Sequence, residues 1–245
     1  AAHNAKGMFP TIFDLVHEQR PDAKVYGFYE WAGQIRMYDT DSFDLLEQGK
    51  DGEETIKKAF AKYMEDNIMR YAVEMYFDKE SEDKIWKYIE KIKDSGLGKR
   101  YYDWGVKPHV SLGIFNDIDE EKANLVLEKF ALSHKVIPAY LGSVGMFPDS
   151  GAIYLAPIVR DDLINLNKDL LEAMKEIDPN PERWYSPGIW IPHCAVALEL
   201  DRDQLVKAAD IVIHDFEKLA GKFVSFGLVK VLEPSVEMKE YFFSR

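Results

Sequence analysis

Two stretches of this 245-residue chain, VKPHVSLGIF around His109 and WIPHCAVALEL around His193, share one pattern. Each places a proline and then a histidine at the start of an apolar run, with a small residue two positions beyond the histidine. Residues i and i+2 of a β-strand point to the same face of a sheet. His109 and Ser111 should therefore share one face, as should His193 and Ala195. We interpret the two stretches as corresponding strands of two similar lobes.

The segments around these strands alternate between β-type and helical patterns from Met69 onward. MRYAVEMYF is typical of a strand, and SEDKIWKYIEKIKDSG predicts a helix with Ser81 as its N-cap and Gly96 as its stop. The turn signal PDSG joins two later strands into a hairpin. The expected order is strand–helix–strand–helix–hairpin, then helix–strand–helix–strand–strand. This order predicts an α+β fold of two pseudo-symmetric lobes, each of mixed or antiparallel sheet with flanking helices, around a central cleft.

Composition and charge exclude several classes of protein. Hydrophobic residues make up 47% of the chain and charged residues 30%, which is typical of a globular protein. No apolar run approaches the roughly 20 residues that span a bilayer, and we expect neither a signal peptide nor a membrane association. The single cysteine, Cys194, excludes an internal disulfide and favours a reducing compartment, the cytoplasm. A net charge of −12 argues against binding long nucleic acid through a broad basic surface.

Paired histidines suit phosphoester chemistry. One imidazole takes a proton from the attacking hydroxyl or water, while the other gives a proton to the leaving oxygen. The unperturbed imidazole pKa of about 6.5 lets one ring be neutral and the other protonated near neutral pH. A hydroxyl two residues after the histidine can donate a hydrogen bond to a phosphate oxygen. Such a site needs neither a metal ion nor an organic cofactor, and we expect none.

From Met69 to its end, the chain resembles the two-histidine (2H) phosphoesterases, which include 2′-5′ RNA ligase and cyclic phosphodiesterase proteins. The hallmark of that superfamily is two copies of His-x-Ser/Thr followed by an apolar residue, one copy in each lobe. HVSL at His109 matches it fully, and HCAV at His193 matches except at Ala195. The resemblance implies His109 and His193 as the acid–base pair, with Ser111 on the phosphate. It implies a substrate with a 2′,3′-cyclic or 2′-5′ phosphodiester.

Ala195 is the departure from the pattern, because a phosphate-binding hydroxyl is expected there. A lost hydrogen bond to a charged phosphate is worth roughly 1.5–3 kcal/mol, which is about ten- to a hundredfold in rate if it acts in the transition state. The site is then slow rather than inactive, or Cys194 or a backbone amide replaces the hydroxyl. The third interpretation is a protein that binds its ligand without turnover.

Aromatic residues near the two motifs are candidates for stacking on a nucleobase. Core or rim packing explains them about as well. Lys107, next to the first motif, is a candidate phosphate ligand, although an exposed lysine beside a strand needs no such role. The stacking candidates are Tyr102, Trp104, Phe147 and Trp190.

Residues 1–68 have a different character and are predicted to be a small, separate α/β segment. They resemble a fragment of the alkaline-phosphatase superfamily, near its type I phosphodiesterase and nucleotide pyrophosphatase branch. Those enzymes need a Ser or Thr nucleophile and two metal sites built from Asp and His, and nothing in this chain supplies that set. The acidic segment DTDSFDLLEQGKDG is predicted to be a loop, in which Asp39, Asp41 and Asp44 form a solvated turn. We interpret residues 1–68 as non-catalytic and residues 69–245 as the 2H-like domain.

The sequence therefore predicts a metal-independent phosphoesterase acting on a small nucleotide or an RNA end. The first alternative is a module that binds nucleotides or RNA ends with weakened or no catalysis. The second is a hydrolase of the nucleotide pyrophosphatase type, which the missing ligands disfavour. The sequence leaves open which histidine is the acid, what the natural substrate is and what the oligomeric state is.

Overall fold

The computed structural model describes residues 26–29, 45–48 and 69–244. The chain divides into two compact units, residues 1–68 and 69–245. In the first unit, β1 (Tyr26–Tyr29) and β2 (Leu45–Gln48) pair in parallel. The segment that contains β2 was predicted to be a loop, and that prediction is wrong for Leu45–Gln48, where backbone pairing with β1 overrides the polar composition. Asp39, Asp41 and Asp44 lie outside the described residues.

The second unit begins with β3, and its elements follow the order that the sequence predicts, with two short additions, α5 and η2. Their bounds are β3 Arg70–Phe77, α4 Lys79–Asp94, α5 Lys99–Trp104, β4 His109–Asn116, α6 Glu120–Ser133, β5 Ile137–Phe147, β6 Ala152–Pro157, α7 Asp161–Met174, η2 Arg183–Tyr185, β7 Cys194–Ala197, α8 Arg202–His214, β8 Leu219–Lys230 and β9 Val236–Phe242.

Seven strands form one sheet in the order β4-β3-β8-β5-β6-β7, and β9 adds to the free side of β8. Every pairing between these named strands is antiparallel, so the mixed sheet that was also expected is not formed. The long strand β8 is shared between the lobes, because its first residues pair with β5 and the rest pair with β3 and β9. One lobe is therefore β4-β3-β8-β9, and the other is β7-β6-β5 with the start of β8.

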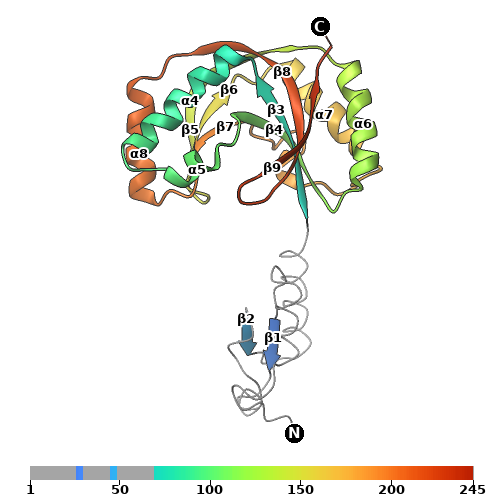
Figure 1. Cartoon of the computed structure of the whole chain (residues 1–245), viewed down its shortest axis with the longest axis horizontal. Helices are drawn as coiled ribbons and strands as arrows, with labels where there is room; N and C mark the ends of the chain where they lie inside the picture. The colour runs from blue at the N-terminus through green and yellow to red at the C-terminus, as the bar shows by residue number, and fades with distance from the viewer. Residues whose placement is uncertain (1–25, 30–44, 49–68, 245) are drawn as a thin grey trace. The chain divides into compact units, whose positions relative to one another are not determined.

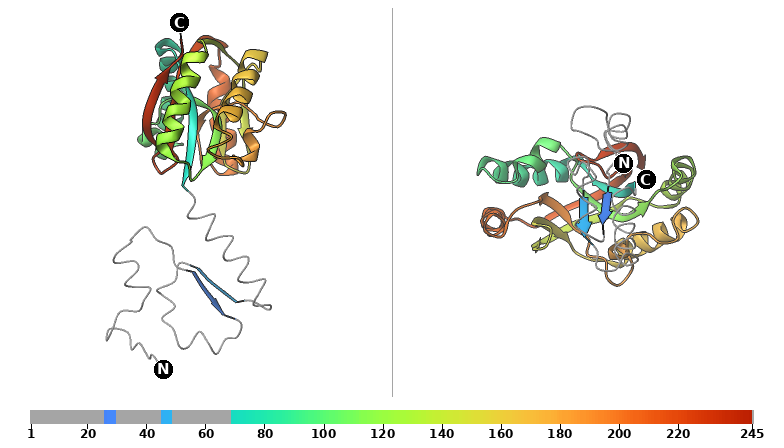
Figure 2. Two further views of the ribbon diagram at one scale, coloured as in Figure 1. Left: turned by 90° about the vertical axis from the view of Figure 1, so that its right-hand side faces the viewer. Right: turned by 90° about the horizontal axis from the view of Figure 1, so that it is seen from below.

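The helices lie in two groups on opposite sides of the unit (Figures 1 and 2). Helices α4 and α8 contact each other and the strands of the β5-β6-β7 lobe. Helices α6 and α7 contact each other, with α6 on β9 and α7 on β4. This is the predicted α+β fold of two lobes with flanking helices.

The core forms where the apolar faces of the helices meet the sheet. Ile85, Ile89 and Ile92 recur at helical spacing in α4 and are all buried, as the sequence pattern predicts. The largest fully buried side chains come from both lobes: Met75, Leu112, Phe115, Leu127, Leu141, Ile153, Leu155, Phe223 and Phe226. One continuous core therefore fixes the two lobes against each other.

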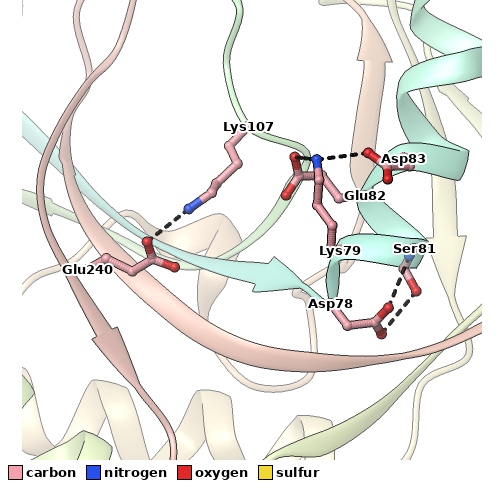
Figure 3. A network of polar contacts seen from close by, with 7 residues as sticks. All are labelled: Asp78, Lys79, Ser81, Glu82, Asp83, Lys107 and Glu240. Atoms are coloured by element: carbon pink, nitrogen blue, oxygen red, sulfur yellow. Dashed lines mark hydrogen bonds and ion pairs between the residues drawn. The ribbon is translucent and has the colours of Figure 1, made fainter.

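The N-cap of α4 is Asp78, not Ser81 as predicted (Figure 3). The Asp78 carboxylate accepts hydrogen bonds from the Ser81 backbone N–H at 3.0 Å and the Ser81 hydroxyl at 3.1 Å, and another from the backbone N–H of Lys222. A carboxylate can satisfy all three donors at once, which a serine hydroxyl cannot. Asp78 thereby joins the start of α4 to β8.

Candidate active site

The two histidines begin the strands at the opposite ends of the sheet order. His109 is the first residue of β4, and His193 immediately precedes β7. Although β4 and β7 end the hydrogen-bonded path, the two strands lie beside each other, with Cα atoms within 8 Å. The sheet therefore curves until its two edge strands meet. This curvature brings one histidine from each lobe into a single site.

Both imidazole rings are oriented in the same way. Nδ1 of His109 lies 2.8 Å from the backbone oxygen of Lys107, and Nδ1 of His193 lies 2.8 Å from the backbone oxygen of Ile191. A carbonyl oxygen only accepts, so Nδ1 carries the hydrogen in both rings. In each neutral ring Nε2 is then the nitrogen without a hydrogen, which can accept a proton. The repeated bond to the residue two positions earlier is a local symmetry that the paired sequence motifs produce.

A buried carboxyl group lies beside the first histidine. Oε1 of Glu74 is 3.5 Å from Nε2 of His109, and the Glu74 side chain is only 7% exposed. Glu74 lies in β3 directly opposite Ser111 of β4. Burial raises the pKa of Glu74, and the positive charge of His109 partly opposes that rise. Glu74 lies outside both histidine motifs and was not predicted as a site residue, although a lone acidic residue inside an apolar strand is a signal that could have found it.

The second histidine has an aromatic environment instead. The ring of Phe147 meets His193 edge-on at 4.8 Å between centroids, and Tyr154 lies 5.4 Å away. Phe147 and Tyr154 also stack on each other at 4.4 Å. Burial lowers the pKa of His193, and the charge of His109 lowers it further. His193 is therefore neutral over a wider range of pH than an ordinary histidine.

Ser111 follows His109 on the same face of β4 and contacts a tyrosine. Burial raises the pKa of Tyr185 to about 12, and a hydrogen bond with the Ser111 side chain partly opposes that rise. Tyr185 therefore stays a neutral phenol near neutral pH. The predicted phosphate-binding position thus holds two hydroxyl groups, those of Ser111 and Tyr185. Tyr185 is in η2, within the Pro-rich segment DPNPERWYSPG before the second motif, and as an aromatic residue near that motif it was expected to be able to stack on a base, not to contact Ser111.

Ala195 pairs with Tyr154 of β6 and is partly exposed. Cys194 was expected to be able to replace the missing hydroxyl, but its side chain is fully buried in the core. Burial raises the pKa of the Cys194 thiol to about 12, so the thiol stays neutral. Successive residues of a strand point to opposite faces, so Cys194 cannot share the face of Ala195. The backbone oxygen of Ala195 accepts a hydrogen bond from the Tyr101 hydroxyl at 3.1 Å.

A pocket of about 270 Å³ lies beside the first histidine, because Glu74, the carboxyl group next to His109, lines it. Trp104 lines this pocket, and the guanidinium of Arg100 lies 4.8 Å from the centroid of the Trp104 ring. The lining residues are Glu74, Tyr76, Trp104, Gly105, Val106, Lys107, Val229, Ser235 and Glu237.

Lys107 also lines the pocket but is engaged by other side chains. Its amine lies 3.0 Å from Glu240 of β9, as Figure 3 shows, and 3.9 Å from Glu237. It also lies 4.1 Å from the ring centroid of Tyr76. A phosphate would have to compete with two carboxylates for this amine, which disfavours Lys107 as a phosphate ligand.

The other three stacking candidates each have a different environment. Phe147 contacts His193 as described. Tyr102 packs edge-on against Trp86 at 6.2 Å and lies under the amine of Lys93. Trp190 is 8% exposed and belongs to the hydrophobic core. We therefore retain Phe147 and Trp104 as candidates for contact with a nucleobase.

Within the described residues, no group of three or more His, Cys, Asp or Glu side chains is arranged to hold a metal ion. No helix in that part of the chain has both the length and the apolar character that crossing a bilayer requires.

The fold and the site together describe a two-lobed α+β protein in which each lobe supplies one histidine. Residues 81–230 match the sequence model of the family described as the 2′-5′ RNA ligase superfamily. The match spans more than half of the chain. The chain therefore belongs to the 2′-5′ RNA ligase superfamily, the 2H phosphoesterases.

Solved structures of low sequence identity also overlap with this chain. Escherichia coli LigT complexed with NADP⁺ is 15% identical, with a TM-score of 0.47, over 73% of this chain and 99% of that one. The complex of E. coli LigT with 3′-AMP is 12% identical, with a TM-score of 0.46, over 73% and 100%. Kluyveromyces marxianus Usb1 with uridine monophosphate is 14% identical, with a TM-score of 0.38, over 71% and 98%. A comparison with curated proteins finds no match.

Proposed function

We propose that this protein is a metal-independent phosphoesterase that acts on 2′,3′-cyclic or 2′-5′ phosphodiester bonds of small nucleotides or RNA ends. The observation that carries the proposal is the matched orientation of His109 and His193. Both rings are held through Nδ1 and keep Nε2 for proton transfer. Two such rings at the meeting point of two edge strands provide the acid and the base of a phosphoryl transfer.

In the proposed hydrolysis, one Nε2 removes a proton from water as the water oxygen attacks phosphorus. The other Nε2–H gives its proton to the ribose oxygen as the bond between that oxygen and phosphorus breaks. The Ser111 hydroxyl donates a hydrogen bond to a phosphate oxygen, and Tyr185 is close enough to Ser111 to orient that hydroxyl. At the matching position of the other lobe, Ala195 offers no hydroxyl, so phosphate is held less well there.

The pocket that Glu74 lines beside His109 supports a small nucleotide or an RNA end as the ligand. It has room for a nucleobase, and Trp104 offers an aromatic surface within it. The net charge of −12 supports the same restriction, since an acidic protein repels a long phosphate backbone. The single cysteine favours a reducing compartment, so we place this activity in the cytoplasm.

The test is hydrolysis of 2′,3′-cyclic nucleotides in the presence of EDTA by the wild type and by His109→Ala and His193→Ala. We expect turnover that resists the chelator and falls by about 10²–10⁴-fold in each variant, because each removes a general acid or base. His214→Ala is the matched control, since His214 is exposed at the end of α8. Turnover abolished by EDTA, or unchanged in both site variants, would contradict the proposal.

A second candidate is a binding module without turnover, which the missing hydroxyl at Ala195 and the engaged Lys107 favour. The same wild-type assay separates the two functions. Saturable binding of 3′-AMP measured by calorimetry, together with no hydrolysis of any cyclic nucleotide, would support the module. The third candidate, a two-metal hydrolase of the nucleotide pyrophosphatase type, would be stopped by EDTA.

A further inference from the structure

The environments of the two histidines differ in a way that assigns their roles. His109 has a carboxyl group 3.5 Å from its reactive nitrogen, whereas His193 has two aromatic rings against its imidazole. A carboxylate favours the protonated form of a nearby imidazole, and an apolar environment favours the neutral form. The asymmetry lies in side chains outside both sequence motifs.

We propose that Glu74 is a positioning residue that keeps the reactive proton on His109, which makes His109 the general acid and leaves His193 as the general base. The inference rests on the proposed phosphoesterase function and adds to the site a carboxyl group that lies outside both motifs. Glu74 does not need to touch the substrate for this role, because it acts through the charge of His109.

Because both side chains are largely buried, Glu74 and His109 together bind one proton tightly. The Glu74 side chain is 7% exposed and that of His109 is 18% exposed, so neither is well solvated as an isolated charge. One proton shared between them gives either an ion pair or two neutral groups, and both states have zero net charge. At 3.5 Å the contact is at the long limit of a hydrogen bond, so the proton is held by charge and can still be passed to a leaving oxygen.

Other titratable groups also face Glu74 from every neighbouring element. Glu237 of β9 opposes ionisation of Glu74, while Tyr76 of β3 donates a hydrogen bond that favours it. Tyr101 of α5 and Tyr185 of η2 also interact with the charge of Glu74. Their own pKa values are raised, so both phenols are neutral near neutral pH and leave His109 as the partner that can carry a positive charge.

Hydrolysis of a cyclic phosphodiester uses both histidines for proton transfer. Nε2 of His193 takes a proton from water, the water oxygen bonds to phosphorus, and the bond from phosphorus to one ribose oxygen breaks. The electron pair of that bond stays on the ribose oxygen, which takes the proton from His109. The cycle ends with an imidazolium at His193 and an unprotonated His109–Glu74 pair, and proton exchange with solvent restores both.

The test combines the pH dependence of kcat/KM with NMR titration of the histidine rings in Glu74→Gln. The substitution keeps the shape of the side chain and removes its charge. We expect the pKa of His109 to fall by about 1–3 units and the high-pH limb of the profile to move to lower pH by the same amount. At a pH well above the high-pH limb of both proteins, activity then falls about tenfold for each unit of that shift. The low-pH limb, set by His193, should stay below pH 6.5, the ordinary histidine value.

Two variants make the result specific. Glu237→Gln removes another carboxylate from the same pocket that does not contact His109, and it should move the His109 titration much less. Glu74→Asp keeps the charge at a longer distance, and its high-pH limb should lie between those of the wild type and Glu74→Gln. It also provides the test if Glu74→Gln does not fold.

Three outcomes separate this inference from the proposed function. A lower His109 pKa in Glu74→Gln without any hydrolysis by the wild type would support the pairing and reject the phosphoesterase function. Hydrolysis with an unmoved high-pH limb and His109 titration would overturn the role of Glu74. A shift of the low-pH limb alone would overturn the assignment of acid and base.

Discussion

At the scale of single residues, the site is two similar half-sites that differ in their neighbours. Each histidine donates from Nδ1 to the carbonyl two residues earlier, so the ring orientation belongs to the local motif. The groups that tune the rings come from other strands: Glu74 from β3, Phe147 from β5 and Tyr154 from β6. The motif therefore sets which nitrogen carries the hydrogen in the neutral ring, and tertiary contacts set the environment of the other nitrogen.

Ala195→Thr should increase hydrolysis of a cyclic nucleotide. Its hydroxyl would add a hydrogen bond to the phosphate at the position that matches Ser111. A hydrogen bond to a charged group is worth roughly 1.5–3 kcal/mol, so we expect kcat/KM to rise about ten- to a hundredfold if the bond forms in the transition state. The measurement is the steady-state rate with 2′,3′-cyclic nucleotides.

Ala195→Val is the matched control for that substitution, because valine has the shape of threonine without its hydroxyl. A threonine variant no faster than the valine variant would mean that the loss of the hydroxyl does not limit the rate. Equal rates in the wild type, the threonine variant and the valine variant would mean that the phosphate does not bind next to β7.

At the scale of elements, the edge of β4 that does not pair with β3 is covered by the Pro-rich loop after α7. The backbone N–H of Asn116 donates to the buried carboxylate of Asp178 at 2.8 Å, and the backbone N–H of Glu182 donates to the oxygen of Ile114 at 2.8 Å. Such a cover satisfies edge groups that would otherwise be free to pair with another strand. It also places Tyr185 against Ser111.

The side chain of Asn167 in α7 links β4 to the loop that covers its edge. Its buried side-chain amide donates to the backbone oxygens of Leu112 at 2.7 Å and Tyr185 at 3.1 Å, and so ties β4 to η2. Asn167→Ala leaves two carbonyls without this donor, at roughly 1–3 kcal/mol for each unpaired buried group. Its own Oδ1 has no protein partner in the described structure, which offsets part of that cost. We expect the free energy of unfolding to fall by about 2 kcal/mol.

Chemical denaturation measures that change, and Asn165→Ala is the control on the same helix, since Asn165 is exposed. Asn165→Ala should change stability by less than about 0.5 kcal/mol. Equal effects of the two substitutions would show that the buried amide does not anchor the loop.

Element type was predictable for most of residues 69–244, because hydrophobic periodicity and turn residues are local signals. Ile85, Ile89 and Ile92 marked α4, and PDSG marked the β5–β6 hairpin. The exact cap of α4 was not predictable, since the choice of Asp78 over Ser81 also depends on a contact with β8. The strand β2 was missed for the same kind of reason, because pairing with β1 lies outside its own sequence.

At the scale of the whole molecule, the unit of residues 69–245 has its own core and contains every residue of the candidate site. A variant comprising only residues 69–245 should therefore fold cooperatively and hydrolyse a cyclic nucleotide at the rate of the full chain. Circular dichroism and the EDTA-resistant assay measure the two properties. A folded variant that has lost activity would give residues 1–68 a part in catalysis, against the prediction that they are a non-catalytic fragment.

The sequence by itself determined the two-lobed α+β fold, the family and the pair of histidines, because all three follow from patterns that repeat along the chain. Tertiary structure alone decided the surroundings of those histidines. Only the curvature of the sheet brings β4 beside β7, and only the strand register places Glu74 opposite Ser111. The pKa of a buried group depends on neighbours distant in sequence, so the difference in environment between the two similar motifs is a property of the folded chain.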